Sequence, residues 1–243
     1  MTQYQILSQS FDKVLAIFAH PDDAEIACGG TLASFAKNGS EVHLIYLTSG
    51  DKGSFDSSLL PDTVAKTRSI EFKKAAVCLG IKSVQTFNIP DGEIAESKEL
   101  RFKIVESIRS IRPELVICPD PTAVFFSQSY YNHRDHRTTG FVVLDSISPE
   151  AAMPLYHKGA GDPFQVPTVF LSGSLEPDLI VDISDGIDQK IQAVLAYESR
   201  ISDESNYISD VVLDMAKKDG ELAKVDFGES FRKILFNSVE YRQ

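Results

Sequence analysis

One histidine and two aspartates follow an apolar segment near the start of the chain. The segment Lys13–Ala19 reads KVLAIFA, and His20, Asp22 and Asp23 stand in the turn after it. Such an unbroken apolar run is typical of a strand buried on both faces of a parallel sheet, so the turn falls at a strand's carboxyl end, where open α/β sheets build sites. Pro21 favours a sharp bend that lets His20 and Asp23 converge. An imidazole and a carboxylate placed in this way suit zinc or ferrous iron.

A second polar cluster favours a metal site over the ordinary alternative. That alternative is a turn that only caps the expected helix Glu25–Asn38, since Pro and Asp are common in turns and at helix starts. However, residues 131–137 read YNHRDHR and follow another apolar segment, Glu114–Pro119. They open a helix expected to run from Asp135 to about Ser148. Two His/Asp clusters at the carboxyl ends of two strands indicate one joint site.

The second cluster offers two histidines with different possible roles. His133 and His136 are three residues apart, so they can share one face at the start of a helix. Asp135 between them can hydrogen-bond a ring nitrogen and fix its tautomer.

Several segments of this chain resemble the LmbE-like, or PIG-L, family of metal-dependent N-deacetylases. The two clusters carry the resemblance, as HPDDAE followed by Gly29 and Gly30, and as HRDH. Other segments fall where that family has similar motifs: SGD at Ser49–Asp51, the helix at Arg68–Gly80, PDG at Pro90–Gly92, VDIS at Val181–Ser184 and GESF at Gly228–Phe231. The resemblance spans nearly the whole chain.

The chemistry and the resemblance together assign roles to the two clusters. Three residues would hold one divalent metal, zinc or ferrous iron, and leave a position open as catalytic zinc sites do: His20, Asp23 and His136. Asp22 would be the general base that takes a proton from water and returns it to the leaving amine. His133, oriented by Asp135, would donate to the oxyanion of the tetrahedral intermediate. A third metal ligand and a simple helix cap are the alternatives for His133.

The expected substrate contacts rest mainly on the resemblance. It implies that Arg68 reaches polar groups of the substrate, whereas an ion pair with Glu71 is the alternative that spacing alone favours. Some members of the family place a mobile tyrosine at the position of Tyr131. Asp51 and Asp91 could bind sugar hydroxyls, or they could be ordinary turn residues beside glycine.

Two arginines depart from the family pattern. The second motif of the family is often HPDH, whereas this chain has Arg134 between His133 and Asp135. In YESR, Arg200 stands where the family commonly has glutamine. Neither arginine replaces an expected metal ligand, so the expected type of reaction is the same. The identity of the substrate does not follow from the resemblance. A cation near the site would favour an anionic amino sugar.

Composition excludes several classes of function. The 243 residues are 43% hydrophobic, enough for one large core, so we expect a single domain over residues 1–243. The net charge of −11 argues against nucleic-acid and membrane partners. The start of the chain has no signal-like segment, and no apolar stretch nears the ~18 residues that span a bilayer. We therefore expect a cytoplasmic protein whose Cys28, Cys78 and Cys118 are reduced thiols in apolar surroundings.

The order of elements predicts a Rossmann-like α/β fold with a mainly parallel sheet and helices on both faces. The first half alternates expected strands and helices: Lys13–Ala19, Glu25–Asn38, Glu41–Thr48, Thr63–Leu79, Ser83–Ile89, Lys98–Arg112 and Glu114–Pro119. The second half is looser, with strands near Thr168–Leu171 and Leu179–Ile183 and a helix near Asp185–Tyr197. A polar segment, residues 202–224, and an apolar-rich stretch, Phe231–Val239, follow.

These observations predict a zinc-dependent N-deacetylase acting on a small N-acetylglucosamine-type sugar or its conjugate. The resemblance also implies a homo-oligomer, a trimer or hexamer. Two alternatives remain. One is a ferrous oxygenase with two histidines and one carboxylate, to which His133 and Asp135 would contribute. The other is a non-catalytic sugar-binding member of the same fold.

Overall fold

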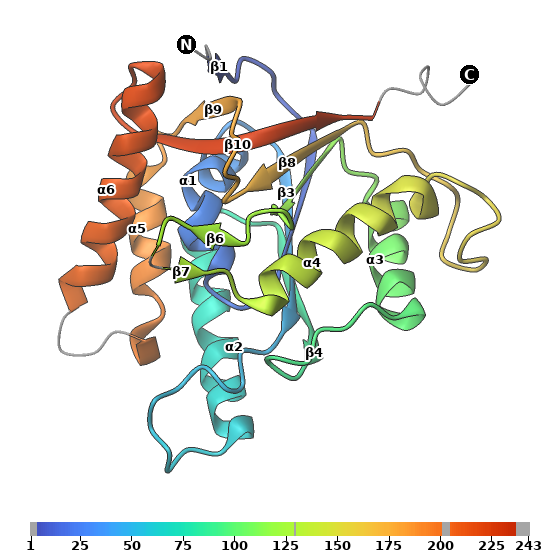
Figure 1. Ribbon diagram of the computed structural model, residues 1–243, viewed down its shortest axis with the longest axis horizontal. Coiled ribbons are helices and arrows are strands. Elements are labelled where there is room, and N and C mark those ends of the chain that lie inside the picture. The colour runs from blue at the N-terminus through green and yellow to red at the C-terminus, as the bar shows by residue number, and fades with distance from the viewer. Residues whose placement is uncertain (1–3, 129, 201–204, 237–243) are drawn as a thin grey trace.

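The protein is built around a mainly parallel sheet, as predicted. A computed structural model describes residues 4–128, 130–200 and 205–236. Within this part of the chain, eight strands form one sheet in the order β1-β9-β10-β8-β5-β2-β3-β4 (Figure 1). Their bounds are β1 Gln5–Ile6, β2 Lys13–Phe18, β3 Glu41–Thr48, β4 Ser83–Ile89, β5 Leu115–Pro119, β8 Thr168–Ser172, β9 Leu179–Asp182 and β10 Gly228–Leu235. Only β10 runs antiparallel to its neighbours, β8 and β9.

Helices cover both faces of the sheet. One face carries α1 (Asp23–Lys37), α2 (Pro61–Cys78), α5 (Ile187–Leu195) and α6 (Ser205–Ala223), and the other carries α3 (Lys98–Ile111) and α4 (Arg134–Asp145). The alternation of side chains along β2 explains this arrangement. Val14, Ala16 and Phe18 pack toward α1, whereas Leu15 and Ile17 pack toward α3 and α4. Because β2 is buried on both faces, it is apolar at every position from Val14 to Phe18.

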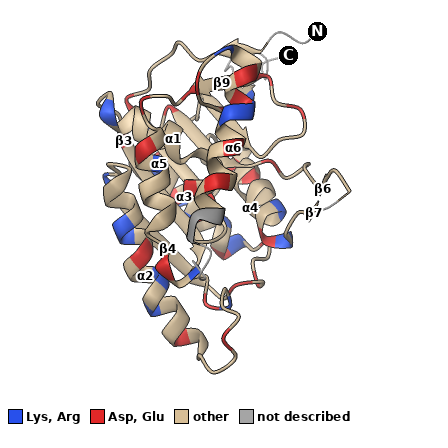
Figure 2. Ribbon diagram, turned by 90° about the vertical axis from the view of Figure 1, so that its left-hand side faces the viewer, with Lys and Arg blue, Asp and Glu red and all other residues tan. Residues whose placement is uncertain are grey.

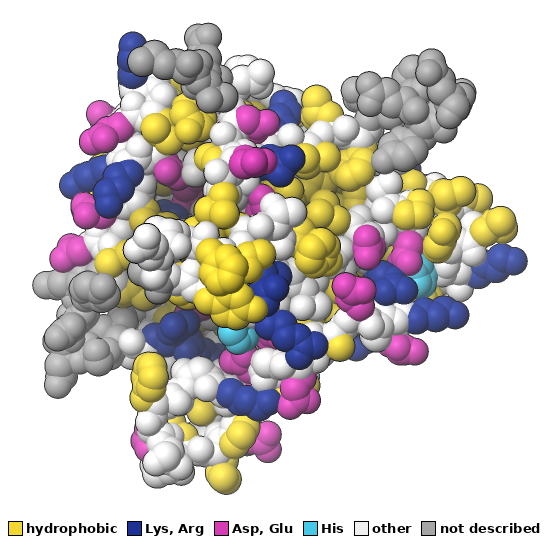
Figure 3. Space-filling model, in the orientation of Figure 1, with side chains coloured by type: hydrophobic (Ala, Val, Ile, Leu, Met, Phe, Trp, Pro, Cys, Tyr) yellow, Lys and Arg dark blue, Asp and Glu magenta, His cyan; other side chains and the backbone are white. Residues whose placement is uncertain are grey.

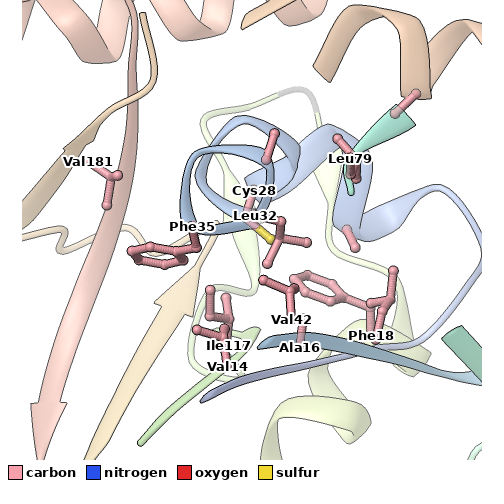
Figure 4. Close-up of a cluster of buried hydrophobic side chains, with 14 of the residues drawn as sticks. Val14, Ala16, Phe18, Cys28, Leu32, Phe35, Val42, Leu79, Ile117 and Val181 are labelled. Atoms are coloured by element: carbon pink, nitrogen blue, oxygen red, sulfur yellow. The ribbon is translucent and has the colours of Figure 1, made fainter. Parts of the chain in front are cut away.

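The packing of α1 on the sheet fixes the position of the turn that follows β2. Leu32 and Phe35 of α1 lie over Val14 and Ala16 of β2 (Figure 4), and Leu32, Val14 and Ala16 are fully buried. Burial of a Leu or Phe side chain contributes about 1.5–3 kcal/mol. Helix α1 is thus anchored to the strand that precedes the turn.

Most predicted boundaries agree with the structure to within two residues, and the differences lie in the second half. Helix α4 ends at Asp145, and a short helical segment, η1 (Ser146–Ala151), replaces its expected last turn. Residues 202–224, expected only to be polar, contain the long helix α6 because Val212 and Ala216 share one buried face. Residues 237–239 of the expected apolar stretch lie outside the described residues.

Three short features were not predicted, and the first is the edge strand β1 (Gln5–Ile6). A hairpin of β6 (Phe125–Phe126) and β7 (Tyr130–Tyr131) stands in the connection between β5 and α4. The short helix η2 (Glu198–Arg200) follows α5.

The chain is acidic, with a net charge of −11. Figure 2 shows residues of both charge signs along α2. The cysteine thiols are free, with Cys28 and Cys118 buried and Cys78 half-buried. Among the described residues, no helix is both long and apolar enough to cross a membrane.

Candidate active site

A cavity of about 1220 Å³ opens at the carboxyl ends of the central strands. It lies beside the β6–β7 hairpin, where Figure 3 shows hydrophobic side chains with a histidine below them and cationic side chains on both sides. Seven of the ten residues singled out in the sequence as site candidates line it: His20, Asp22, Asp23, Arg68, Asp91, His133 and His136. The structure therefore brings these residues together at one edge of the sheet.

Three side chains form a tight group of nitrogen and oxygen atoms. His20 Nδ1 lies 3.3 Å from His136 Nε2 and 3.3 Å from Asp23 Oδ2, and His136 Nε2 lies 3.2 Å from Asp23 Oδ1. In a tetrahedral zinc site with bonds of about 2.0–2.1 Å, ligand atoms lie ~3.3–3.4 Å apart. The spacing and chemistry of these three donors fit such a metal.

The other side of the His20 ring offers a second set of donors. His20 Nε2 lies 2.9 Å from Asp91 Oδ1 and 3.4 Å from Asp135 Oδ2, and these three residues could also hold a cation, as could His20 with His133 and His136. A histidine that binds a metal through one ring nitrogen usually donates the other N–H to a carboxylate. Asp91 and Asp135 fit that supporting role, which leaves Nδ1 to the first group.

Two further contacts orient the first group. The backbone N–H of His20 donates to Asp23 Oδ2 at 2.8 Å, which holds this carboxylate in the turn. Asn132 Oδ1 lies 3.0 Å from His136 Nδ1, so an N–H there directs the lone pair of Nε2 toward Asp23 and His20. Asn132 is itself fixed, because its Nδ2 donates to Ala123 O at 2.7 Å. Sequence reasoning missed Asn132, and its position four residues before His136 was the only signal.

The electrostatics of this group favour positive charge. Burial alone would lower the pKa of His20, but Asp23, Asp135 and Asp91 outweigh it and raise that pKa to about 12. Burial alone would raise the pKa of Asp23, but His136 and His20 hold it well below its ordinary value. An ionised carboxylate between two imidazoles is what a divalent cation requires.

Asp22 is buried next to this group and faces two arginines. Its backbone is left-handed, with φ 103°, which turns the side chain away from that of Asp23. Its Oδ2 contacts Nη1 of Arg200 and lies 3.6 Å from Nη1 of Arg68. Burial raises the pKa of Asp22 to about 6, with Arg200 opposing the rise and Asp23 adding to it. A carboxylate with this pKa is suited to accept a proton near neutral pH.

Arg68 points toward the cavity and not toward Glu71. The side chain is only 2% exposed, its Nη2 donates to Gly53 O at 3.1 Å, and its Nε and Nη1 have no hydrogen-bond partner among the described groups. Glu71 instead accepts from the backbone and hydroxyl of Ser199 at 2.7 and 2.8 Å. The alternative ion pair between Arg68 and Glu71 is therefore not formed, and the Arg68 guanidinium instead lies in the cavity wall beside Asp22.

His133 is the exposed histidine of the site. It caps the start of α4, and its ring centroid lies 5.1 Å from that of His20 and 5.6 Å from that of His136. Burial and the neighbouring His20 lower its pKa. A neutral imidazole in this position can donate one N–H into the cavity.

Three predicted residues lie outside the cavity lining. Asp51 Oδ1 accepts from the backbone N–H of Asp91 at 2.7 Å, so it braces two loops. Tyr131 faces away and accepts from Arg137 Nη2 at 2.6 Å, while Tyr130 lines the cavity, because successive residues of a strand point to opposite sides. Asp135 is fully buried and accepts from Gly92 N–H at 2.7 Å, next to His20. The expected hydrogen bond from Asp135 to His133 is absent from the described contacts.

A buried network under the turn was also missed. Glu25 is fully buried and accepts from the hydroxyls of Tyr46 and Tyr197, at 2.7 and 2.9 Å. Burial raises the pKa of Glu25 to about 7, although the Tyr46 hydrogen bond opposes the rise. The Arg68 guanidinium lies 5.7 Å from the centre of the Tyr197 ring, so the network also supports Arg68.

Comparison with known proteins gives consistent matches. The sequence profile of the PIG-L family, described as GlcNAc-PI de-N-acetylase, matches residues 15–147. Diacetylchitobiose deacetylase of Thermococcus kodakarensis is 34% identical over 79% of this chain and 71% of its own length. A 1D-myo-inositol 2-acetamido-2-deoxy-alpha-D-glucopyranoside deacetylase of a Mycobacterium species is 24% identical over 83% of this chain and 78% of its own length.

A solved structure agrees with these sequence matches. The N,N'-diacetylchitobiose deacetylase of Pyrococcus horikoshii, complexed with the inhibitor MPG, superimposes with a TM-score of 0.85 at 30% identity. The match covers 93% of this chain and 84% of that one.

Proposed function

This chain belongs to the PIG-L family of de-N-acetylases, and we propose on that premise that it hydrolyses the N-acetyl amide of an N-acetylglucosamine-type sugar or conjugate. The observation that carries the proposal is that one cavity holds Asp22 beside His20, Asp23 and His136, three donors of the kind that bind a divalent metal. An amide needs a base for the attacking water, an acid for the leaving amine and a stabilised oxyanion. The cavity offers a candidate for each.

The proposed metal ligands are His20, Asp23 and His136, and the proposed metal is zinc. When bound, a divalent cation lowers the pKa of a coordinated water and polarises the amide carbonyl. Asp22 accepts the proton of the attacking water and later delivers it to the amine. Its buried position between Arg200 and Arg68 supports this role, because a pKa of about 6 permits both steps near neutral pH.

Two other side chains complete the proposed chemistry. His133 donates an N–H to the oxyanion as the tetrahedral intermediate forms, and its lowered pKa keeps it neutral with one N–H to give. Arg68, whose guanidinium lies in the cavity wall beside Asp22, binds a hydroxyl or carbonyl of the sugar. Arg134 is exposed and does not line the cavity, so it gives no reason to expect an anionic sugar.

The names of the relatives support the substrate class. Those proteins are named for deacetylation of diacetylchitobiose and of a 2-acetamido-2-deoxy-glucopyranoside. None of the matches reported above is named as an oxygenase. A single domain, a cytoplasmic location and a trimeric or hexameric assembly remain predictions.

A screen of N-acetylated amino sugars, with released acetate measured, tests the proposal. We expect acetate release from at least one N-acetylglucosamine derivative, loss of activity with a chelator and recovery with added zinc. Asp22→Asn is the control for contaminating activity. Sugar binding without acetate release from any compound would favour the non-catalytic alternative, and oxygen consumption with a 2-oxoacid would favour the oxygenase.

A further inference from the structure

Helix α1 is broken just after the turn that carries the proposed ligand Asp23. Cys28 has φ −148° and ψ 19°, which is not helical. In a regular helix, Gly30 N–H would donate to Ile26 O, four residues earlier. The break separates a first turn, residues 23–27, from the remainder of α1 and leaves backbone groups on both sides in need of new partners.

A buried ion pair supplies those partners. Glu229 of β10 accepts from Gly30 N–H at 3.0 Å and from Thr31 N–H at 2.7 Å. Lys190 of α5 donates to Ile26 O at 2.7 Å and to Glu229 at 2.5 Å. The two side chains are only 2–4% exposed. The pair therefore stands at the break and binds the two backbone groups, Gly30 N–H and Ile26 O, that would bond each other in a regular helix.

Three sequence segments without an assigned role meet at this break. A Cβ atom added to Gly30 would come within 2.6 Å of Ile183, and one added to Gly29 within 3.3 Å of Lys190. Gly29 and Gly30 follow the first cluster, Ile183 belongs to VDIS, and Glu229 belongs to GESF. The glycines let β10, α5 and the loop after β9 approach the backbone of α1.

We infer that Lys190 and Glu229 are positioning residues, which hold the first turn of α1 at the angle that directs Asp22 and Asp23 into the cavity. This inference rests on the proposed function. Neither residue lines the cavity, so both act through the backbone of residues 23–31. A buried ion pair adds little net stability compared with an apolar pair of similar size, so stability alone does not account for it. Its particular contribution is to satisfy an acceptor and two donors at a fixed break.

The first test compares Glu229→Gln with a matched control, Arg109→Met. Arg109 is also buried and charged, and it donates to backbone oxygens of residues 150–161 on the opposite face of the sheet. Both variants should lower the thermal midpoint. Only Glu229→Gln should lower kcat, by about 10²-fold, because a shift of about 1 Å in catalytic groups has that effect. We expect KM to change less than threefold.

Zinc affinity, measured by competition with a chromogenic chelator, is a second readout that does not require activity. It should weaken about 10–100-fold in Glu229→Gln, as for other residues that support metal ligands, and stay unchanged in Arg109→Met. Equal kcat and zinc affinity in Glu229→Gln and the wild type would overturn the inference. Wild-type protein without deacetylase activity would instead contradict the proposed function, and the affinity comparison would still test the positioning role.

The double variant Lys190→Met with Glu229→Gln separates positioning from stability. Because removal of both charges leaves none unpaired, its thermal midpoint should exceed that of Glu229→Gln. Its kcat and zinc affinity should stay low, since Ile26 O and one of the two N–H groups of Gly30 and Thr31 still lack their partners. Recovery of kcat together with stability would overturn the inference, and this variant also serves if Glu229→Gln does not fold.

Discussion

The two polar connections that meet at the cavity differ in how firmly they are held. In the connection after β2, Asp22 is buried between arginines and Glu25 is buried under two tyrosines. In the connection between β5 and α4, Tyr130 and Tyr131 are 49% and 57% exposed, and His133 is exposed as well. The first connection is fixed by the core, and the second is attached to the core mainly through Asn132 and Asp135.

This difference indicates that the two connections have different roles. Groups whose position must be accurate before substrate arrives are best placed on a buried, hydrogen-bonded turn, and groups that adapt to substrate are best placed on an exposed loop. Changes in the first connection should therefore affect the chemical step or the metal. Changes in the hairpin should affect mainly the fit of the substrate.

The largest effect is expected from Asp22→Asn. Asparagine tolerates the left-handed backbone and keeps the shape of the side chain, but it cannot accept the proton. We expect kcat to fall by ~10²–10⁴-fold while zinc content stays near that of the wild type. Asp23→Asn is the matched change next to it and should lose zinc as well as rate. Zinc content by elemental analysis and kcat should be measured in both variants. If Asp22→Asn loses zinc and Asp23→Asn keeps it, the roles of the two aspartates are exchanged.

His133→Ala should lower kcat by ~10²–10³-fold, as for loss of an oxyanion donor, without loss of zinc. His136→Ala, three residues later on the same helix, should lose the metal. Metal content by elemental analysis distinguishes them. If His133→Ala also loses zinc, His133 is itself a metal ligand, and the contrast between ligands on the buried connection and a donor on the exposed one fails at this residue.

Glu25→Gln tests the buried connection after β2 through the pH dependence of the free energy of unfolding. The pKa of Glu25 rises from 4.5 to about 7 on folding, so between these values the unfolded chain has lost a proton that the folded protein keeps. The free energy of unfolding should therefore fall by about 3 kcal/mol as pH rises through this window. Urea unfolding at pH 4.5 and pH 7.5 should show that this decrease is smaller in Glu25→Gln by about that amount. Parallel pH dependences would mean that Glu25 is ionised in the folded protein.

Asn132→Leu removes the acceptor that fixes the His136 ring while keeping a similar volume. Supporting residues of this kind change metal affinity by ~10–100-fold, so zinc should bind more weakly and added zinc should restore most of the rate. Zinc titration of activity measures both quantities. An unchanged affinity would show that helix α4 alone orients His136.

The smallest effect is expected from Tyr131→Phe. The hydroxyl binds Arg137 on the outside of the hairpin, and an exposed contact of this kind contributes ~1 kcal/mol or less. We expect kcat to stay within threefold of the wild type, whereas Tyr130→Ala should raise KM. A large loss of kcat in Tyr131→Phe would mean that the hairpin turns this side chain inward when substrate binds.

The sequence placed most of the candidate residues at the edge of the sheet where the cavity lies, but it could not orient several of their side chains. His20, Asp23 and His136 could be found because each follows a buried strand and has a type suited to a metal. The choice between Tyr130 and Tyr131 depends on the register of a two-residue strand, where one step reverses the face. The partner of Asp135 depends on how α4 sits beside the loop of Gly92, which no local pattern records. The contact between Glu229 and α1 joins residues 199 positions apart, beyond any periodicity.

The placement of Glu229 on β10 has a consequence for the order of synthesis and folding. Chains begin to fold from the amino terminus as they are made. By the time α6 has been synthesised, all three proposed ligands and Asp22 are already part of the chain. The carboxylate that occupies the break in α1 is still missing, because β10 is the last strand among the described residues and inserts between β8 and β9. If Glu229 positions the turn as we infer, the turn reaches its final form only with this strand, and a truncated chain that carries all the proposed reacting groups should lack their final alignment.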